Sequence, residues 1–125
     1  MNLLLDTHVL IWALENNPTL SVKAKNVITD GRNMVFVSSA TVWEIGIKQA
    51  MGKLDVPGNL QEEIKLHRFT PLDISFQHAT VASQLPALHK DPFDRMLIAQ
   101  AITEKLTLVT RDRLIQQYDL NCLEA

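Results

Sequence analysis

The stretch DPFDRMLIAQAITEKLTLVTRD, residues 91–112, contains one helix, one strand and the loop that follows the strand. Asp91 is a good N-cap and Pro92 suits the first helical position, so a helix is expected over about residues 92–104. Residues 106–109 form a short apolar run, which is typical of a strand buried on both faces. A helix that leads directly into such a strand indicates an α/β fold. The apolar stripe of the helix consists of Leu97, Ile98, Ala101 and Ile102.

The rest of the chain repeats this alternation of short apolar runs and longer helical patterns. Strands are expected over residues 3–5 and 34–37, with shorter edge strands around residues 69–72 and 120–123. Pro57 and Gly58 predict a turn before the fourth helix. We therefore predict an α/β fold in which a central parallel sheet has helices on both sides. The other helices are expected at about residues 7–15, 21–30, 39–51, 59–67 and 75–84.

Length, charge and cysteine content narrow the function classes. A chain of 125 residues is expected to form one domain over residues 1–125. With 12 Lys and Arg against 14 Asp and Glu, the chain has no general basic field, so nucleic acid would have to bind a local patch. The one cysteine, Cys122, excludes an internal disulfide and a multi-cysteine metal site. No apolar run approaches the ~18 residues of a membrane span, and the start MNLLLD lacks the features of a signal peptide, so a cytoplasmic protein is expected.

Four acidic residues are expected to meet at one edge of the predicted sheet. Asp6 follows the first strand directly, and Glu44 lies one helical turn beyond the second strand. Asp112 follows the strand at residues 106–109, and Asp94 begins the helix that leads into that strand. In an open parallel sheet, ligands bind at the carboxyl ends of the strands. The sequence therefore predicts a functional site built from these four carboxylates.

These acids also have structural interpretations. Asp6 could cap the first helix, and Asp112 could cap a short final helix. Glu44 could close a capping box with Thr41, or it could pair with Lys48 four residues further on. Each interpretation is reasonable for one residue alone. Chance rarely brings four acids to one sheet edge, however, and this favours the functional interpretation.

Four carboxylates at one place repel each other strongly unless a cation neutralises them. Oxygen ligands without cysteine or a histidine cluster favour a hard cation, Mg²⁺ or Mn²⁺. Such a cation suits phosphodiester hydrolysis, so the expected substrate is a phosphate backbone. Basic residues close to the acids in the sequence could hold the phosphates, although about half of them are expected to be ordinary surface residues. They are Lys48, Lys90, Arg95, Arg111 and Arg113.

The histidines and tryptophans give weaker signals. No pair of histidines suggests metal-free acid–base catalysis, so each is expected on the surface or in helix packing. His8 is the exception, because it follows Asp6 closely and could line the site without being a ligand. Trp12 and Trp43 lie in apolar helices, where core or dimer packing is favoured over stacking on an unpaired base. The apolar run at residues 9–14 is wide enough for part of it to contact a partner chain. The four histidines are His8, His67, His78 and His89.

Four stretches of the sequence resemble the PIN domain, and specifically the VapC-type ribonuclease toxins of toxin–antitoxin systems. They are LLLDTHVLIWAL, SSATVWEIGIKQAMGKL, DPFDRMLIAQA and LTLVTRD, in the family's order and spacing. The resemblance covers essentially the whole chain and implies a compact α/β/α sandwich around a parallel sheet. It also implies a Mg²⁺-dependent endoribonuclease that cuts single-stranded or looped RNA and leaves 5′-phosphate and 3′-hydroxyl ends. The implied partners are an antitoxin whose tail blocks the acidic cleft and a second copy of the chain.

The same resemblance implies a role for each residue of the acidic set. Asp6 and Asp94 are the expected principal metal ligands, and Glu44 and Asp112 complete the site. Thr110, in the T-R-D match, would orient Asp112 or a water on the metal. These roles are expectations carried over from the family onto the matching positions of this sequence.

The DPFD stretch carries two acids where the family pattern requires one. Asp94 is the better candidate for the ligand, because it is in phase with the buried helical stripe and precedes LIAQA at the family spacing. Asp91 is better placed as the helix cap. Whether Asp91 also contacts the metal stays open at this point.

Two other classes compete with a nuclease. A catalytically silent PIN-like module would bind RNA or a partner protein, would bind metal weakly, and would not respond to a chelator. A receiver-type signalling domain also uses Asp and Mg²⁺ at strand ends, but it needs an acceptor Asp directly after its central strand. Here residues 34–37 are followed by Ser38 and Ser39, which counts against a receiver domain.

Overall fold

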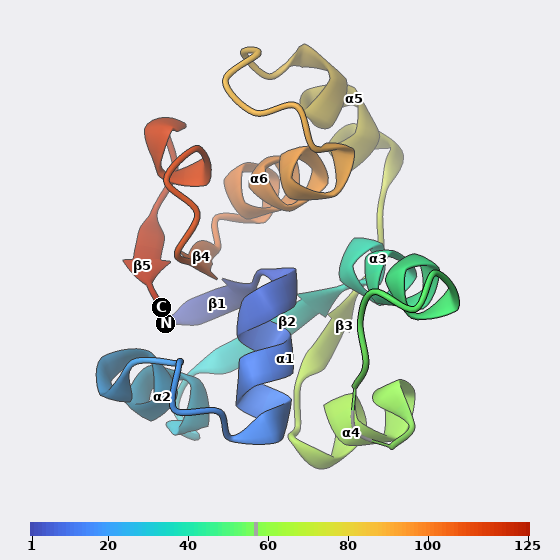
Figure 1. The fold of residues 1–125 in the computed structure, drawn as a ribbon. Helices are drawn as coiled ribbons and strands as arrows, with labels where there is room; N and C mark the ends of the chain where they lie inside the picture. Colours follow the sequence, from blue (N-terminus) through green and yellow to red (C-terminus); the bar gives the residue numbers. More distant parts are fainter. Residues whose placement is uncertain (57) are drawn as a thin grey trace.

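A computed structural model describes residues 1–56 and 58–125, and Pro57 of the predicted Pro57–Gly58 turn lies outside the described residues. The centre of the fold is a five-stranded sheet in the order β3-β2-β1-β4-β5, and every neighbouring pair of strands is parallel (Figure 1). This confirms the α/β fold with a central parallel sheet. The strands are β1 (Asn2–Leu5), β2 (Met34–Ser38), β3 (Thr70–Leu72), β4 (Thr107–Thr110) and β5 (Cys122–Glu124).

Helices form close to where the sequence predicts them. One boundary changes an interpretation: α3 begins at Ser39, and the Ser38 hydroxyl accepts the Ala40 N–H as its cap. Thr41 therefore lies in the first turn of the helix, and the predicted Thr41–Glu44 capping box is wrong. The helices are α1 (Thr7–Glu15), α2 (Val22–Thr29), α3 (Ser39–Ala50), α4 (Leu60–Leu66), α5 (Phe76–Gln84), α6 (Pro92–Glu104) and the short 3₁₀ helix η1 (Ile115–Gln117).

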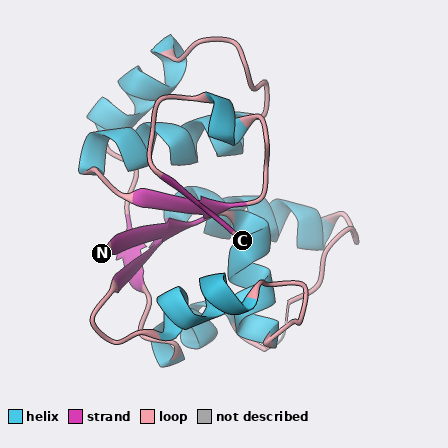
Figure 2. Ribbon diagram, turned by 90° about the vertical axis from the view of Figure 1, so that its left-hand side faces the viewer, coloured by secondary structure: helices cyan, strands magenta, loops and turns pink. Residues whose placement is uncertain are grey.

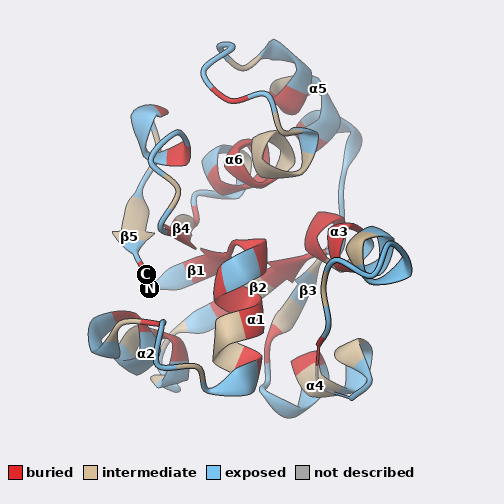
Figure 3. Ribbon diagram, in the orientation of Figure 1, coloured by how far each residue is buried: buried red, intermediate tan, exposed pale blue. Residues whose placement is uncertain are grey.

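The sheet is buried on both faces, and alternate residues of each strand contribute to different cores (Figures 2 and 3). Leu3 and Leu5 of β1 face the core that α1, α2 and α4 cover, whereas Leu4 faces the core under α6. Side chains in a strand point alternately to its two faces, so one continuous apolar run can supply both cores. This explains why β1 and β2 contain runs of consecutive apolar residues.

Helix α1 contributes its apolar run to the chain's own core. Val9 and Leu10 are fully buried, Ile11 and Leu14 are nearly so, and Trp12 packs partly against the same core. Most of the apolar run at residues 9–14 thus packs within the chain, and a partner contact for the rest of it stays a prediction. Trp43 is 65% exposed and its ring lies edge-on to that of Phe93, with the ring centroids 5.3 Å apart, so it does not pack in the core of the chain. Its expected alternative, packing in a dimer, stays a prediction.

The order of the strands creates a switch point beside β1. From β1 the chain proceeds to β2 and then β3 on one side, while β4 pairs with the other side of β1 and leads on to β5. Open parallel sheets bind ligands outside the carboxyl ends of the strands at such a point. A ligand site is therefore expected at the carboxyl ends of β1 and β4. In the part of the chain that the structure describes, no helix has the length and apolarity needed to cross a membrane.

Removal of the Tyr118 hydroxyl should destabilise the fold. The Tyr118 oxygen accepts the N–H groups of Leu88 at 3.1 Å and His89 at 2.8 Å, and it donates to the Pro86 carbonyl at 2.6 Å. Tyr118→Phe leaves these main-chain groups without their partner, so we expect a loss of about 1–3 kcal/mol in the free energy of unfolding, measured by urea denaturation. Phe76→Leu, at a side chain that is 96% exposed, is the control. Equal stability of both variants would contradict the structural role of the hydroxyl.

Candidate functional site

A cavity of about 390 Å³ lies at the carboxyl ends of β1 and β4, at the switch point of the sheet. All four predicted acids line it, so the structure brings together residues that are spread over most of the chain. A larger hollow of about 600 Å³ lies between α3 and α4, but its lining is mostly apolar and contains no carboxylate. The smaller cavity is therefore the one that can support acid–base or metal chemistry. Its acids are Asp6, Glu44, Asp94 and Asp112, and Asp91 also contributes to the lining.

Asp6 combines a structural role with a place in the cavity. Its Oδ1 accepts the Val9 N–H at 2.9 Å and so caps α1, as the structural interpretation proposed. The side chain is almost completely buried, and this burial raises the pKa of Asp6 above its ordinary value. The Thr110 hydroxyl favours the ionised form and opposes part of the increase, while the charge of Asp112 adds to it. Capping one oxygen fixes the carboxylate without removing it from the cavity.

Glu44 reaches the cavity from the second turn of α3. Its Oε1 accepts the Thr7 hydroxyl at 2.6 Å, and its Oε2 pairs with the Lys48 ammonium at 2.6 Å. The i,i+4 pair with Lys48 is thus present, and the hydrogen bond to Glu44 raises the pKa of Lys48. Glu44 is the acid whose charge is most directly balanced by the protein itself.

The two acids of DPFD, Asp91 and Asp94, have different positions at the start of α6, as the sequence predicts. Asp91 is the N-cap of α6, and its Oδ1 accepts the N–H groups of Phe93 at 2.8 Å and Asp94 at 3.1 Å. Asp94 lies in the first turn and points into the cavity. Burial, followed by the negative charge of Asp91, raises the pKa of Asp94 to about 7. Near neutral pH this carboxyl is therefore poised between its protonated and charged forms.

Asp112 is held by donors on both of its oxygens. Its Oδ1 accepts the N–H groups of Leu114 at 2.8 Å and Ile115 at 3.3 Å, just before η1 begins. Its own N–H donates to the Thr110 hydroxyl at 3.0 Å. Burial acts to raise the pKa of Asp112, but hydrogen bonds from His89 and from these backbone N–H groups outweigh it and leave the pKa lowered. Asp112 is thus stabilised as a carboxylate.

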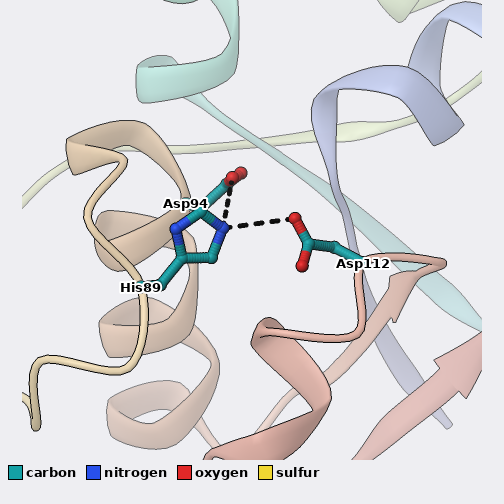
Figure 4. Close-up of side chains that lie close together, drawn as sticks. All are labelled: His89, Asp94 and Asp112. Atoms are coloured by element: carbon teal, nitrogen blue, oxygen red, sulfur yellow. Dashed lines mark hydrogen bonds and ion pairs between the residues drawn. The ribbon is translucent and has the colours of Figure 1, made fainter.

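His89 is the residue that the sequence analysis missed. It was expected on the surface or in helix packing, yet it is buried and its Nε2 lies 2.9 Å from Asp94 Oδ2 and 3.2 Å from Asp112 Oδ2 (Figure 4). The Nε2 atom and one oxygen of each acid lie within 4.8 Å of one another. The signal in the sequence that could have indicated His89 was its position, two residues before Asp91, the cap of the helix that carries Asp94.

The other histidines form no hydrogen bond or ion pair with Asp94 or Asp112 among the described residues. His8 lines the cavity, in agreement with the expectation for it. His78 is buried between α5 and α6, with its Nε2 2.8 Å from Glu104 Oε2. His67 is an exposed residue at the end of α4. Among the described histidines, His89 alone forms a hydrogen bond or ion pair with an acid of the cavity.

The predicted basic residues separate into two groups. Lys48 and Arg111 line the cavity, and the Arg111 guanidinium lies 4.8 Å from the centre of the Trp12 ring. Its Nη2 also donates to carbonyl oxygens of Thr19 and Ala125, at 2.6 and 2.7 Å. This fixes a cation at the rim of the acidic cavity. Lys90 and Arg113 are exposed outside the cavity lining.

Arg95 does not point into the cavity, contrary to its predicted role as a phosphate contact. Its guanidinium donates to main-chain carbonyls of the last turn of α5 and of the segment between α5 and α6, at 2.8 to 3.2 Å. Proximity in sequence to Asp94 was misleading, because residues one apart on a helix point in different directions. The carbonyls belong to Ala82, Leu85, Pro86 and His89.

The sequence matches the family model described as the PIN domain over residues 3–120. The chain belongs to the PIN domain family. A comparison with curated proteins gives no significant match. The acidic cavity described above is thus the cavity of a PIN domain, and its four acids come from the stretches in which the sequence resembles that family.

Solved structures share the fold of this PIN domain at low sequence identity. VapBC2 from Rickettsia felis, bound to a DNA fragment from its promoter, is 19% identical with a TM-score of 0.74, and the match covers 100% of this chain and 99% of that one. DNA-bound VapBC from Salmonella typhimurium is 20% identical with a TM-score of 0.68, covering 99% and 98%. VapBC-1 from nontypeable Haemophilus influenzae is 19% identical with a TM-score of 0.61, covering 99% and 98%. These likenesses show a common fold.

Asp94→Asn should stabilise the metal-free PIN domain at neutral and higher pH. The folded pKa of about 7 exceeds the ordinary value of 3.8, so the folded state binds more protons between these values. Its stability then falls as the pH rises through this window, and Asn carries no charge to create that loss. We expect a gain of about 1–3 kcal/mol above the folded pKa and little gain below 3.8, measured by urea denaturation in a chelator. Asp119→Asn, at an exposed acid, is the control, and identical pH profiles would contradict the electrostatic explanation.

Arg95→Met should lower stability, because four carbonyl contacts are lost together. We expect a loss of about 1–3 kcal/mol in the free energy of unfolding, whereas Arg113→Met at an exposed site should change it by less than about 0.5 kcal/mol. Urea denaturation of the two variants gives the comparison. Unchanged stability of Arg95→Met would show that these hydrogen bonds contribute nothing.

Proposed function

We propose that this PIN domain is a metal-dependent endoribonuclease that hydrolyses RNA phosphodiester bonds and acts as the toxin of a toxin–antitoxin pair. The observation that carries the proposal is the convergence of Asp6, Glu44, Asp94 and Asp112 on one cavity at the switch point of the sheet. Carboxylates at the carboxyl edge of a parallel sheet are suited to a cationic cofactor and an anionic substrate. The resemblance to VapC-type toxins supplies the reaction class.

The donor set of the cavity fits Mg²⁺ or Mn²⁺. Its acidic ligands are all oxygen donors, which a hard cation prefers. Burial, followed by the charges of neighbouring acids, raises the pKa of Asp94, and a bound cation would favour the ionised form of this carboxyl. Asp6 and Asp94 would be the principal ligands, with Asp112 and Glu44 completing the set. When bound, the metal would neutralise phosphate charge and make water a stronger nucleophile.

The remaining residues would orient the acids and the RNA backbone. The Thr110 hydroxyl accepts the Asp112 N–H and favours the ionised form of Asp6. One hydroxyl at the end of β4 thus interacts with the acid that follows β1 and with the acid that follows β4. Arg111 and Lys48 line the cavity and are the cations best situated for phosphate oxygens. Arg113, exposed one residue beyond Asp112, could contact the backbone further along the strand. Water would add to phosphorus as the 3′-oxygen leaves, giving 5′-phosphate and 3′-hydroxyl ends.

We further propose an antitoxin partner and a second copy of the chain as its assembly. The three solved structures named above carry the VapBC name, and their folds match essentially the whole of this chain. An antitoxin tail that contributes a cation to the acidic cavity would block it, because five acids and two basic residues line the cavity among the described residues. Cytoplasmic location is part of the same proposal, since an RNA substrate and an antitoxin would both be available there.

Asp94→Asn should abolish divalent-cation-dependent RNA cleavage while the fold is retained. Loss of a principal ligand should lower the rate by more than about 100-fold, which exceeds the usual effect of an outer-shell partner. Asp91→Asn should spare most activity, because Asn caps a helix as well as Asp. The measurement is cleavage of a panel of structured RNAs with Mg²⁺ and with chelator, together with circular dichroism of each variant.

The rival function is a silent PIN-like module that binds RNA or a protein without cutting. It requires undiminished function in chelator and no cleavage of any RNA in the panel. Cleavage that persists undiminished in Asp94→Asn would instead reject the assigned site. If Asp91→Asn were inactive and Asp94→Asn active, the two acids of DPFD would have to exchange roles.

A further inference from the structure

The His89 imidazole is fixed by the main chain around it. The backbone N–H of His89 donates to the Tyr118 hydroxyl at 2.8 Å, and the backbone carbonyl of His89 accepts from Arg95 Nη1 at 3.2 Å. The ring is 8% exposed and carries its Nε2 edge toward Asp94 and Asp112 (Figure 4). Burial and these backbone hydrogen bonds restrict the orientations that the His89 side chain can adopt.

The hydrogen-bond pattern determines which ring nitrogen carries the proton. The Asp91 backbone N–H lies 3.2 Å from His89 Nδ1, and a backbone N–H can only donate. Nδ1 therefore accepts with its lone pair, and the ring hydrogen of the neutral imidazole is on Nε2. The Nε2–H group is then a donor directed at the acidic site.

Asp94 and Asp112 interact differently with the Nε2–H group of His89. The contact of Nε2 with Asp112 Oδ2 at 3.2 Å is a hydrogen bond, whereas the contact with Asp94 Oδ2 at 2.9 Å is an ion pair. Asp112 Oδ1 is already engaged by Leu114 and Ile115, so His89 completes the support of this carboxylate. The same imidazole holds Asp112 beside Asp94 and lessens their mutual repulsion.

We propose that His89 is a positioning residue of the acidic site, which orients Asp112 next to Asp94 through its Nε2–H and is not itself a metal ligand. The inference rests on the proposed function, since it assumes that these acids bind a divalent cation. As a ligand, Nε2 would need its lone pair, and the ring hydrogen would move to Nδ1, where it would face the Asp91 N–H. Coordination by His89 would thus cost the hydrogen bonds on both sides of the ring.

Arg95 links the segment that carries His89 to the helix that carries Asp94. Arg95 belongs to α6, the helix that carries Asp94, and it binds the carbonyls of the segment that ends in His89. The segment and the helix are thereby fixed to one another. The distance between the imidazole and Asp94 is set by the same helix that supplies the acid.

Binding of Mn²⁺ alone, measured by calorimetry on the full chain, tests the proposal. His89→Ala should weaken Mn²⁺ binding by about 10–100-fold, the usual effect of losing an outer-shell partner. His89→Gln, whose side-chain amide can donate from a similar position, should recover part of the affinity. His67→Ala removes an exposed histidine and should bind as the wild type does.

The possible outcomes separate this inference from the proposed function. Absence of Mn²⁺ binding by the wild type would reject the metal site itself and this inference with it. Wild-type affinity in His89→Ala would reject only the inference. Equal loss in His89→Ala and His89→Gln would also reject it, because the donated hydrogen would then be irrelevant.

A second measurement covers the case in which His89→Ala does not fold. Long-range ¹H–¹⁵N spectra of the wild type with ¹⁵N-labelled histidine report the tautomer of each ring. We expect the Nε2–H tautomer for His89 both in the absence and in the presence of Mg²⁺. An Nδ1–H tautomer that appears on addition of Mg²⁺ would identify His89 as a ligand and overturn the proposal.

Discussion

Repulsion between carboxylates in a partly buried cavity is the constraint on which the rest of the structure depends. Each acid meets it with a different neighbour: Glu44 has the Lys48 ammonium, Asp112 has His89 and two backbone N–H groups, and Asp6 has a helix N-terminus and the Thr110 hydroxyl. Asp94 is the least compensated, and its pKa is raised to about 7. The protein therefore stabilises most of the negative charge itself and leaves one carboxyl whose ionisation depends on what enters the cavity.

The fold stabilises this arrangement because the carboxylates that cap α1 and α6 also line the cavity. Asp6 caps α1 with one oxygen and faces the cavity, and Asp91 caps α6 so that Asp94 lies in its first turn. The positive end of each helix dipole is thus directed at an acid, which is favourable for the charged form. Structural and chemical interpretations of these residues are compatible, since a carboxylate has two oxygens and a cap requires only one.

The sequence was sufficient to predict the sheet, the helices and the convergence of the four acids. It was insufficient to predict the side chains that surround the acids. Apolar runs, caps and turns are local signals, and the position of Asp6, Asp94 and Asp112 at strand or helix ends follows from them. His89 lies in a segment without regular structure, where periodicity gives no direction, and its position depends on Tyr118, 29 residues away along the chain. The prediction that Arg95 binds phosphate was wrong for a similar reason. The carbonyls that it binds lie at the end of α5 and in the segment between α5 and α6, and they meet Arg95 only through the tertiary fold.

The Tyr118 phenol binds the segment before α6 entirely through main-chain atoms of residues 86, 88 and 89. Every residue type supplies a carbonyl, and every type except proline supplies an N–H. The shape of the segment is thus separated from the identity of most of its side chains. Residues 86–88 are free to diverge in sequence while the path of the chain is preserved, whereas position 118 requires a hydroxyl at the end of a rigid aromatic ring. A substitution near the C-terminal strand can in this way alter a loop that it does not adjoin in sequence.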